Sequence, residues 1–293
     1  MKVSVIVPNY NHAEYLRLRL DSILDQTYRD FEVIILDDCS SDDSRDVIES
    51  YRGNPSVSHI VYNQTNSGSP FHQWKKGMQL ACGELVWIAE SDDCCETGLL
   101  ERLVEPFTSD RACVLSFCAS DKVDASGNSS GLHENLEGIP AFMMDGNAFN
   151  RRYMKRNVVV NASSAVFRKS AGLGVDNGFD RLGGYGDYMF WIGLASVGKV
   201  AYTPEILNHF RFHSTNTTSA MTSSIKGLRE TIITDKFLLD NGIIGGMEFL
   251  SRNLSSAYRM KYRFGEEPPF DGAFFRAALS LKRAYRQALG KDR

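Results

Sequence analysis

Acidic side chains gather directly after short runs of β-branched and aromatic residues. The clearest case is Glu90-Ser91-Asp92-Asp93, which follows the apolar run 85–89. Three carboxylates at the end of a buried strand are costly unless a cation lies beside them. Because side chains alternate along an extended backbone, Glu90 and Asp92 point the same way. This spacing suits one hard divalent ion, Mg²⁺ or Mn²⁺, with coordination positions left open for the oxygens of a diphosphate. The alternative is a turn whose solvated acids cap the next helix.

Three further polar clusters follow apolar runs, at Pro8-Asn9-Tyr10-Asn11, at Asp37-Asp38-Cys39-Ser40 and at 63–69. A carboxylate at a strand end accepts hydrogen bonds from ribose hydroxyls or from a base imide, although an Asx-type turn explains the acidic pair equally well. In an open α/β sheet the loops after the carboxyl ends of the strands form the ligand crevice. Four polar clusters at one such edge therefore indicate one site.

The elements that position these clusters alternate over the first 120 residues, a pattern typical of βα units around a mainly parallel sheet. We predict strands at 3–7, 31–36, 58–62, 85–89 and 113–117, and helices at 12–24, 43–51, 71–81 and 98–107. The segment 120–138 is rich in Gly, Ser, Asn and Asp and predicts a loop or loose hairpin. Later we expect strands at 158–167, 200–202 and 206–212, a helix at 187–197, and helices from 225 onward.

Composition limits the class of protein. The 293 residues are 43% hydrophobic and 24% charged, which indicates a globular chain, and 36 acidic against 33 basic residues leave a net charge of −3. That balance argues against a nucleic-acid binder. The first apolar run is too short for a secretory signal, and no run approaches the length of a membrane helix. Six cysteines without a Cys-x-x-Cys pair or a histidine cluster at zinc spacing favour reduced thiols in a cytoplasmic protein.

The C-terminal stretch is amphipathic and basic. Between 274 and 293 it carries Arg276, Lys282, Arg283, Arg286, Lys291 and Arg293 against Asp292 alone. Two interpretations stay open for it. A helix of this kind can lie on an anionic membrane surface, or it can pack on the protein core with its basic face in solvent.

Four motifs, taken in order and at their spacing, resemble the family 2 glycosyltransferases with the GT-A fold. They are the segments 5–11, 32–40 and 83–93 and the tripeptide Gly186-Asp187-Tyr188. The resemblance covers about residues 1–215, and several motifs in sequence order are far more specific than any one of them. It implies a Rossmann-like nucleotide-binding half, a mainly parallel sheet flanked by helices, and a helical C-terminal extension. We accordingly expect domains at 1–222 and 223–293.

The resemblance also implies roles for particular residues of the donor site. Pro8 and Tyr10 would pack around the nucleotide base, and Asp38 would contact the base or ribose. Asn66 lies in the loop after the third strand, where the family often lines the donor pocket. The family's Asp-x-Asp motif falls on Glu90, Asp92 and Asp93, which would bind the sugar diphosphate and a Mn²⁺ or Mg²⁺ ion. Glu90 departs from the family's aspartate by one methylene, so Asp92 is the safer metal ligand.

Two residues of the second half complete the expected site. Asp187 matches the family's general base, whose task is to take the proton of the acceptor hydroxyl as that oxygen attacks the anomeric carbon. The alternative for Asp187 is an acid favoured by the dipole of the helix that it opens. His213 occupies the position of a histidine that often follows the last sheet strand, and it would contact the metal or diphosphate. A structural histidine is the alternative.

The function implied is an inverting, metal-dependent transfer of a sugar from a UDP- or dTDP-linked donor. The acceptor would be a hydroxyl of a saccharide or lipid-linked glycan in surface polysaccharide synthesis, at the inner face of the membrane if the basic helix binds lipid. Two rival classes remain. A nucleotidyltransferase that makes activated sugars uses a similar sheet but usually has a Gly-rich loop where Pro8-Asn9-Tyr10-Asn11 stands. A non-catalytic nucleotide-binding or scaffold protein on the same fold is the second rival, and Glu90 keeps it open.

Overall fold

The computed structural model describes residues 1–293 except 134, 136, 213–223, 270–271 and 289–293. The chain divides into two compact units, residues 1–213 and 214–293. The predicted boundary between 222 and 223 falls inside the segment that the structure does not describe, and those domain limits stay a prediction.

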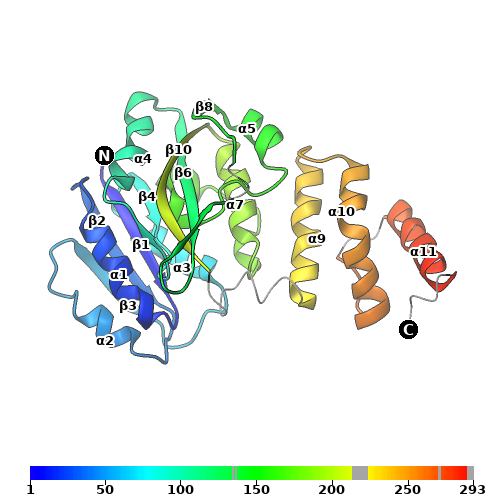
Figure 1. Ribbon diagram of the computed structural model, residues 1–293, viewed down its shortest axis with the longest axis horizontal. Coiled ribbons are helices and arrows are strands. Elements are labelled where there is room, and N and C mark those ends of the chain that lie inside the picture. The colour runs from blue at the N-terminus through cyan, green and yellow to red at the C-terminus, as the bar shows by residue number, and fades with distance from the viewer. Residues whose placement is uncertain (134, 136, 213–223, 270–271, 289–293) are drawn as a thin grey trace. The chain divides into compact units, whose positions relative to one another are not determined.

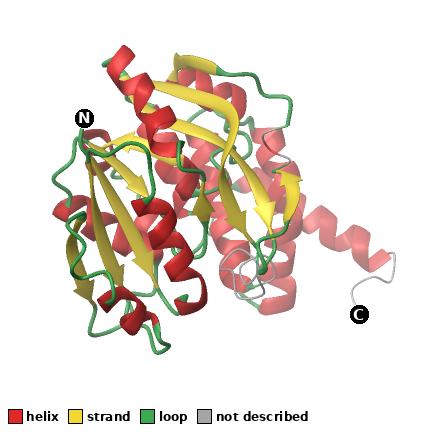
Figure 2. Cartoon of the chain, turned by 60° about the vertical axis from the view of Figure 1, so that its left-hand side comes forward, coloured by secondary structure: helices red, strands yellow, loops and turns green. Residues whose placement is uncertain are grey.

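The first unit is built on one sheet, whose ten described strands are β1 (Val3–Asn9), β2 (Phe31–Asp37), β3 (Val57–Tyr62), β4 (Leu85–Ile88), β5 (Cys94–Cys95), β6 (Cys113–Val123), β7 (Ser129–Leu132), β8 (Phe142–Asp145), β9 (Ala165–Arg168) and β10 (Lys199–Arg211). Their order is β3-β2-β1-β4-β9-β6-β10-β5, with β7 on β6 and β8 on β10 (Figures 1 and 2). Neighbours are parallel from β3 to β4 and again between β6 and β10. β9 runs antiparallel between β4 and β6, so it joins the two parallel parts.

Helices flank this sheet, as Figure 2 shows for the first unit. They are α1 (Ala13–Leu24), α2 (Ser44–Glu49), α3 (Pro70–Leu80), α4 (Leu99–Ser109), α5 (Gly146–Tyr153), α6 (Lys169–Leu173) and α7 (Gly186–Ala195), with single 3₁₀ turns η2 (Ala162–Ser164) and η3 (Phe179–Arg181).

Alternation along the strands divides the core into two layers. Val5 of β1 packs in one layer with Leu16 of α1 and Leu103 of α4. Ile6 points to the opposite face, where a Cβ added to Gly77 of α3 would lie 2.4 Å from Ile6 Cγ2. Helix α3 therefore lies directly on the sheet because residue 77 has no side chain.

The second unit consists of helices. They are α9 (Ile225–Asp240), α10 (Gly246–Arg259), which continues into the π-helical turn η4 (Met260–Phe264), and α11 (Ala273–Ala288). The rings of Phe249 and Phe275 pack 5.8 Å apart, and the buried Asn253 donates to Asp235 over 2.8 Å. Within the described part of the chain, no helix combines the length and the apolar character needed to span a bilayer.

The α/β class with helices on the sheet is confirmed, and the predicted elements of the first 120 residues form within a few positions of their expected ends, except β6, which continues to Val123 instead of ending at 117. Two predictions in the later half are wrong. The segment 158–167 is extended only from Ala165, because η2 interrupts it, and 200–202 and 206–212 form the single irregular strand β10 rather than two strands. The predicted loose hairpin is formed by the end of β6 and β7. All six cysteines are described and are free thiols.

Candidate active site

The turns after β1 and β2 form one hydrogen-bonded unit. Asn9 Nδ2 donates to Asp37 Oδ1 over 2.8 Å, and the Ser41 backbone N–H donates to Asn11 Oδ1 over 2.8 Å. Asn11 and Cys39 have positive φ angles of 55° and 65°, a conformation that is costly for a residue with a side chain. These two strand ends are therefore held in a defined, strained shape.

Pro8 and Tyr10, the predicted contacts of the base, lie at the end of β1. Pro8 is buried within the sheet, whereas the Tyr10 side chain is 47% exposed. An exposed aromatic ring beside a strand end offers an apolar face for stacking. The role of both residues in binding a base stays a prediction.

Asp38 is buried, and its carboxylate already has protein partners. It accepts hydrogen bonds from Asn63 Nδ2 (2.6 Å), from Gln73 Nε2 (2.9 Å) and from the backbone N–H (3.0 Å) and hydroxyl (2.8 Å) of Ser67. Asn66 Nδ2 donates to the backbone carbonyl of Asp38 over 3.1 Å. The structure thus brings the predicted residues Asp38 and Asn66 together, and Asp38 also holds the loop between β3 and α3.

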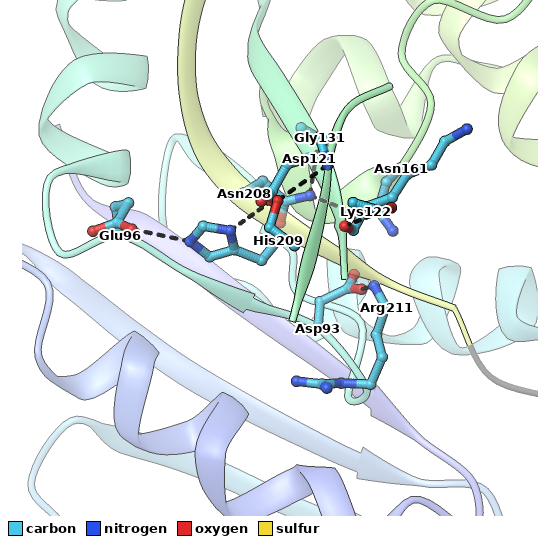
Figure 3. A network of polar contacts seen from close by, with 12 residues as sticks. Asp93, Glu96, Asp121, Lys122, Gly131, Asn161, Asn208, His209 and Arg211 are labelled. Carbon is cyan, nitrogen blue, oxygen red and sulfur yellow. Dashed lines mark hydrogen bonds and ion pairs between the residues drawn. The ribbon is translucent and has the colours of Figure 1, made fainter. Parts of the chain in front are cut away.

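The loop of residues 90–93, here called the acidic loop, follows β4 and is fixed by residues far away in sequence. The Ser163 hydroxyl accepts from the Glu90 backbone N–H (3.0 Å) and donates to Asp93 Oδ2 (2.6 Å). Trp74 Nε1 donates to Glu90 Oε1 over 3.0 Å. Asp93 Oδ1 accepts from the backbone N–H of Arg211 over 3.0 Å (Figure 3). Both oxygens of Asp93 are therefore engaged inside the protein.

The Arg211 side chain ties the acidic loop to the hairpin of β6 and β7. Its Nε donates to the Asp92 carbonyl (2.8 Å), and its Nη1 donates to the carbonyls of Asp124 (2.9 Å) and Ala125 (3.0 Å). Its guanidinium also lies over the ring of Tyr15, 4.9 Å from the centroid. Arg211 thus sets the path of the backbone at Asp92.

The electrostatics of the acidic loop reveal a shortage of positive charge. Burial, followed by the neighbouring Asp92 carboxylate, raises the pKa of Glu90 to about 8. The same two causes raise the pKa of Asp93 above its ordinary range, although its hydrogen bonds act in the opposite direction. A bound cation would relieve both carboxyl groups.

Arg19 of α1 is a buried positive charge that acts on the carboxyl groups of the acidic loop. It is fully buried, its guanidinium lies 4.8 Å from the centroid of the Trp87 ring, and its charge lowers the pKa of Glu90 and of Asp93. Within the described residues none of its three side-chain nitrogens has a hydrogen-bond partner. A buried, unpaired guanidinium is costly, so its attraction to the acidic loop is the compensation that we identify.

The acidic loop offers ligands of the kind that a divalent ion prefers. Carboxylate oxygens are what Mn²⁺ or Mg²⁺ requires, and the raised pKa of Glu90 marks a site that gains from positive charge. Among the described residues no three His, Cys, Asp or Glu side chains are placed to enclose an ion. The described side chains of the acidic loop therefore do not by themselves form a site with three such ligands.

Asp187 lies in the first turn of α7, where Asn157 Nδ2 donates to its Oδ2 over 3.0 Å. Burial raises the pKa of Asp187 to about 6. Gly186 lets the start of α7 approach its neighbours, because a Cβ there would lie 2.3 Å from the Phe179 carbonyl oxygen. A half-buried carboxylate with a pKa near neutrality suits a general base.

The predicted metal contact His213 lies outside the described residues. The nearest described histidine in sequence is His209 of β10, whose Nδ1 lies 2.6 Å from Asp121 Oδ1 and whose Nε2 lies 3.0 Å from Glu96 Oε1 (Figure 3). Burial alone would lower the pKa of His209, but these two carboxylates outweigh it and raise the pKa. His209 thus links β10 and β6 to the segment that follows the acidic loop.

Several residues of the site were not found by sequence reasoning, namely Arg19, Trp74 as a partner of Glu90, Ser163 as a bridge, Asn157 and Arg211. Each acts on an acid from 16 to 118 positions away along the chain. Sequence spacing carries no signal for such contacts. Only Arg19 has a local signal, because a cation on a helix face that otherwise faces the sheet is unusual.

Comparison with known proteins defines the class. Residues 4–171 match the family described as Glycosyl transferase family 2. The chain belongs to this family. The fold is that of TarS residues 1–349 from Staphylococcus aureus, solved with UDP-GlcNAc, with a TM-score of 0.67 at 20% identity over 89% of this chain and 73% of that one. A mannosyltransferase from Pyrobaculum calidifontis, solved with GDP-Man and Mn²⁺, has a TM-score of 0.62 at 15% identity over 97% of this chain and 80% of that one. The predicted GT-A fold class is confirmed.

Curated relatives match part of the chain. The putative teichuronic acid biosynthesis glycosyltransferase TuaG of Bacillus subtilis is 38% identical over 115 residues, 39% of this chain and 45% of TuaG. The poly(ribitol-phosphate) beta-N-acetylglucosaminyltransferase TarS of Staphylococcus aureus is 40% identical over 97 residues, 32% of this chain and 16% of TarS. The chain thus spans about half or less of the length of these relatives.

We predict that Arg19→Met lowers the melting temperature, because it leaves Asp93 and Glu90 without their buried counter-charge. Both acids bind protons more tightly in the folded than in the unfolded state, so the loss of stability should grow as the pH rises from 5 to 8. Thermal unfolding at both pH values measures this.

The control for Arg19→Met is the double variant with Asp93→Asn. If charge is the cause, neutralising Asp93 should recover part of the lost melting temperature at pH 8. Strictly additive losses, or a pH-independent loss, would mean that Arg19 acts only by filling space.

Proposed function

We propose that the protein is an inverting glycosyltransferase. It moves a sugar from a nucleotide-diphosphate donor, of the UDP or dTDP type, to a hydroxyl of a saccharide or lipid-linked glycan. Its place would be surface polysaccharide synthesis at the cytoplasmic side of the membrane. Membership of the family and the names of the relatives support this class of reaction over a nucleotidyltransferase.

The observation that carries the proposal is the acidic loop at the carboxyl end of β4. Its carboxyl groups are held by Ser163, Trp74 and the Arg211 backbone, and they are short of positive charge. A solvated turn needs none of these partners. A loop fixed in this way, beside the strained ends of β1 and β2, suits a nucleoside diphosphate with its cation.

Different residues would bind the donor and activate the acceptor. Pro8, Tyr10, Asp38 and Asn66 would bind the nucleoside, and Glu90, Asp92 and Asp93 would orient the diphosphate. A divalent ion, held by Asp92 with Glu90 and His213, would neutralise charge on the leaving diphosphate. Asp187, its carboxylate oriented by Asn157, would accept the proton of the acceptor hydroxyl during one in-line displacement.

We predict that Asp187→Asn lowers kcat by about 10²–10⁴-fold, the usual contribution of a general base, with little change in donor KM. Since the pKa of Asp187 is raised to about 6, the wild-type rate should fall as the pH drops below 6 and this carboxylate takes up a proton. Donor turnover against pH measures both effects.

The matched control for Asp187 is Asp180→Asn, which changes an acid of η3 that pairs with Lys75 over 2.7 Å. It should keep the wild-type rate and pH profile. An unimpaired Asp187→Asn enzyme would remove Asp187 from the role of base.

We predict that EDTA abolishes turnover and that added Mn²⁺ or Mg²⁺ restores it. In the Asp92→Asn variant the added ion should restore less of the turnover. The physical reason is that, without the ion, the negative charge that develops on the departing diphosphate has no counter-ion. The control is Asp25→Asn, an exposed acid just beyond α1. Full activity in the presence of chelator would contradict the role of the metal. Calorimetry that detects no binding of a nucleoside diphosphate would favour a non-catalytic scaffold.

We further propose that α11 contacts an anionic membrane. Phe275 and Leu279 are buried in the second unit, whereas Leu281 is 73% exposed beside the exposed Arg276 and Arg283. From 272 to 288 the sequence has no acid. An exposed leucine beside exposed cations suits the interface of a membrane that contains anionic lipid.

We predict that the protein co-sediments with vesicles that contain phosphatidylglycerol and does not co-sediment with vesicles of phosphatidylcholine. Arg276→Gln/Arg283→Gln and, separately, Leu281→Asp should each reduce the bound fraction, because they remove the charge or the apolar contact. Arg29→Gln/Arg111→Gln, two exposed cations of the first unit, is the control. Equal binding by all variants would place any membrane contact elsewhere.

A further inference from the structure

Positive charge is concentrated in one part of the first unit. From 146 to 175 the sequence contains no acidic residue, although the whole chain carries 36 acids and a net charge of −3. Four cations of this stretch lie close together in sequence, and all four are exposed: Arg151, Arg152, Lys155 and Arg156. We call these four residues the basic run. An excess of this kind creates a local positive field in an otherwise acidic protein.

The basic run is held against the helix that carries Asp187. Asn150 Nδ2 of α5 donates to the Ile192 carbonyl of α7 over 3.0 Å, and the Tyr188 hydroxyl donates to the Met154 carbonyl over 2.7 Å. The third contact is the hydrogen bond from Asn157 to Asp187. The run thus ends directly beside the residue that orients the carboxylate.

This arrangement puts the end of the basic run one residue away from the partner of Asp187. Arg156 precedes Asn157, and consecutive Cα atoms are about 3.8 Å apart. Asn157 Nδ2 is 3.0 Å from Asp187 Oδ2. A glycan whose hydroxyl approaches Asp187 would therefore pass close to the basic run.

The arginines of the run keep their charge available. Within the described part of the chain, Arg151, Arg152 and Arg156 form no ion pair with a carboxylate, and Arg152 lies over the Tyr153 ring at 5.1 Å. The helix dipole favours cations in the last turn of α5, which explains Arg151 and Arg152 in part. It does not explain Arg156, which follows the helix. Like charges repel, so the three arginines together favour an anionic ligand.

We propose that the basic run is an acceptor subsite and that the acceptor is an anionic glycan. Its phosphodiester or uronate groups would lie a short distance from the hydroxyl that attacks the donor. Guanidinium groups bind both kinds of oxyanion through paired hydrogen bonds. The inference rests on the proposed function for the meaning of Asp187, but its charge requirement can be measured without turnover.

The test measures binding of three fluorescein-labelled oligomers of equal length by anisotropy. They are an oligo(glycerol phosphate), an oligogalacturonate and a neutral maltooligosaccharide, and their comparison separates phosphate from carboxylate. The wild type should bind at least one anionic oligomer about tenfold or more tightly than the neutral one, and added salt should weaken that binding. Arg151→Gln/Arg156→Gln should lose this preference, whereas Arg29→Gln/Arg111→Gln should keep it.

Three results would overturn the proposal. They are equal affinity for neutral and anionic oligomers, an unchanged preference in Arg151→Gln/Arg156→Gln, and an equal loss in the control pair. Phosphatidylglycerol vesicles form a fourth arm: vesicle binding that depends on the basic run, without oligomer binding, would also overturn it by making the run a lipid contact. Release of nucleoside diphosphate from the donor in the absence of acceptor tests the proposed function separately, and it should be the same in both double variants.

Discussion

The structure depends on the burial of carboxylates at the carboxyl edge of its parallel strands. Glu90 and Asp93 are costly there, as the raised pKa values of both show. The buried charge of Arg19 and hydrogen bonds from Ser163, Trp74 and Arg211 compensate these acids in part. The negative charge that remains uncompensated can attract a cation that binds together with a ligand.

The same contacts join the two parts of the sheet. Ser163 precedes β9, the strand that runs antiparallel between β4 and β6, and its hydroxyl reaches back to Asp93. Trp74 bonds to Glu90, and its ring packs against Phe190 and Trp191 of α7. The acidic loop and the helix of Asp187 are thus connected through one buried aromatic layer, which fixes the loop relative to α7.

The sequence was enough to predict the βα alternation, the strand ends and the acidic loop, because these depend on local periodicity and on polar residues after apolar runs. It was not enough for the segment 158–167, where the β-branched residues suggest a strand but Asn161 accepts from the Ser163 backbone N–H and begins a 3₁₀ turn. Nor does it predict the partners of Asp38 or Asp93, since those contacts form only when the sheet assembles. Family resemblance placed Asp187, whose local sequence is compatible with a simple helix start.

The central claim is that the strand ends and the acidic loop form one donor site facing Asp187. A crystal structure of the protein with UDP and Mn²⁺ tests it most directly. We expect the nucleoside at the ends of β1 and β2, the ion in contact with an Asp92 oxygen, and the diphosphate between that ion and the side of the site where Asp187 lies. A nucleotide bound elsewhere, or an ion that touches none of the acidic-loop carboxylates, would contradict it.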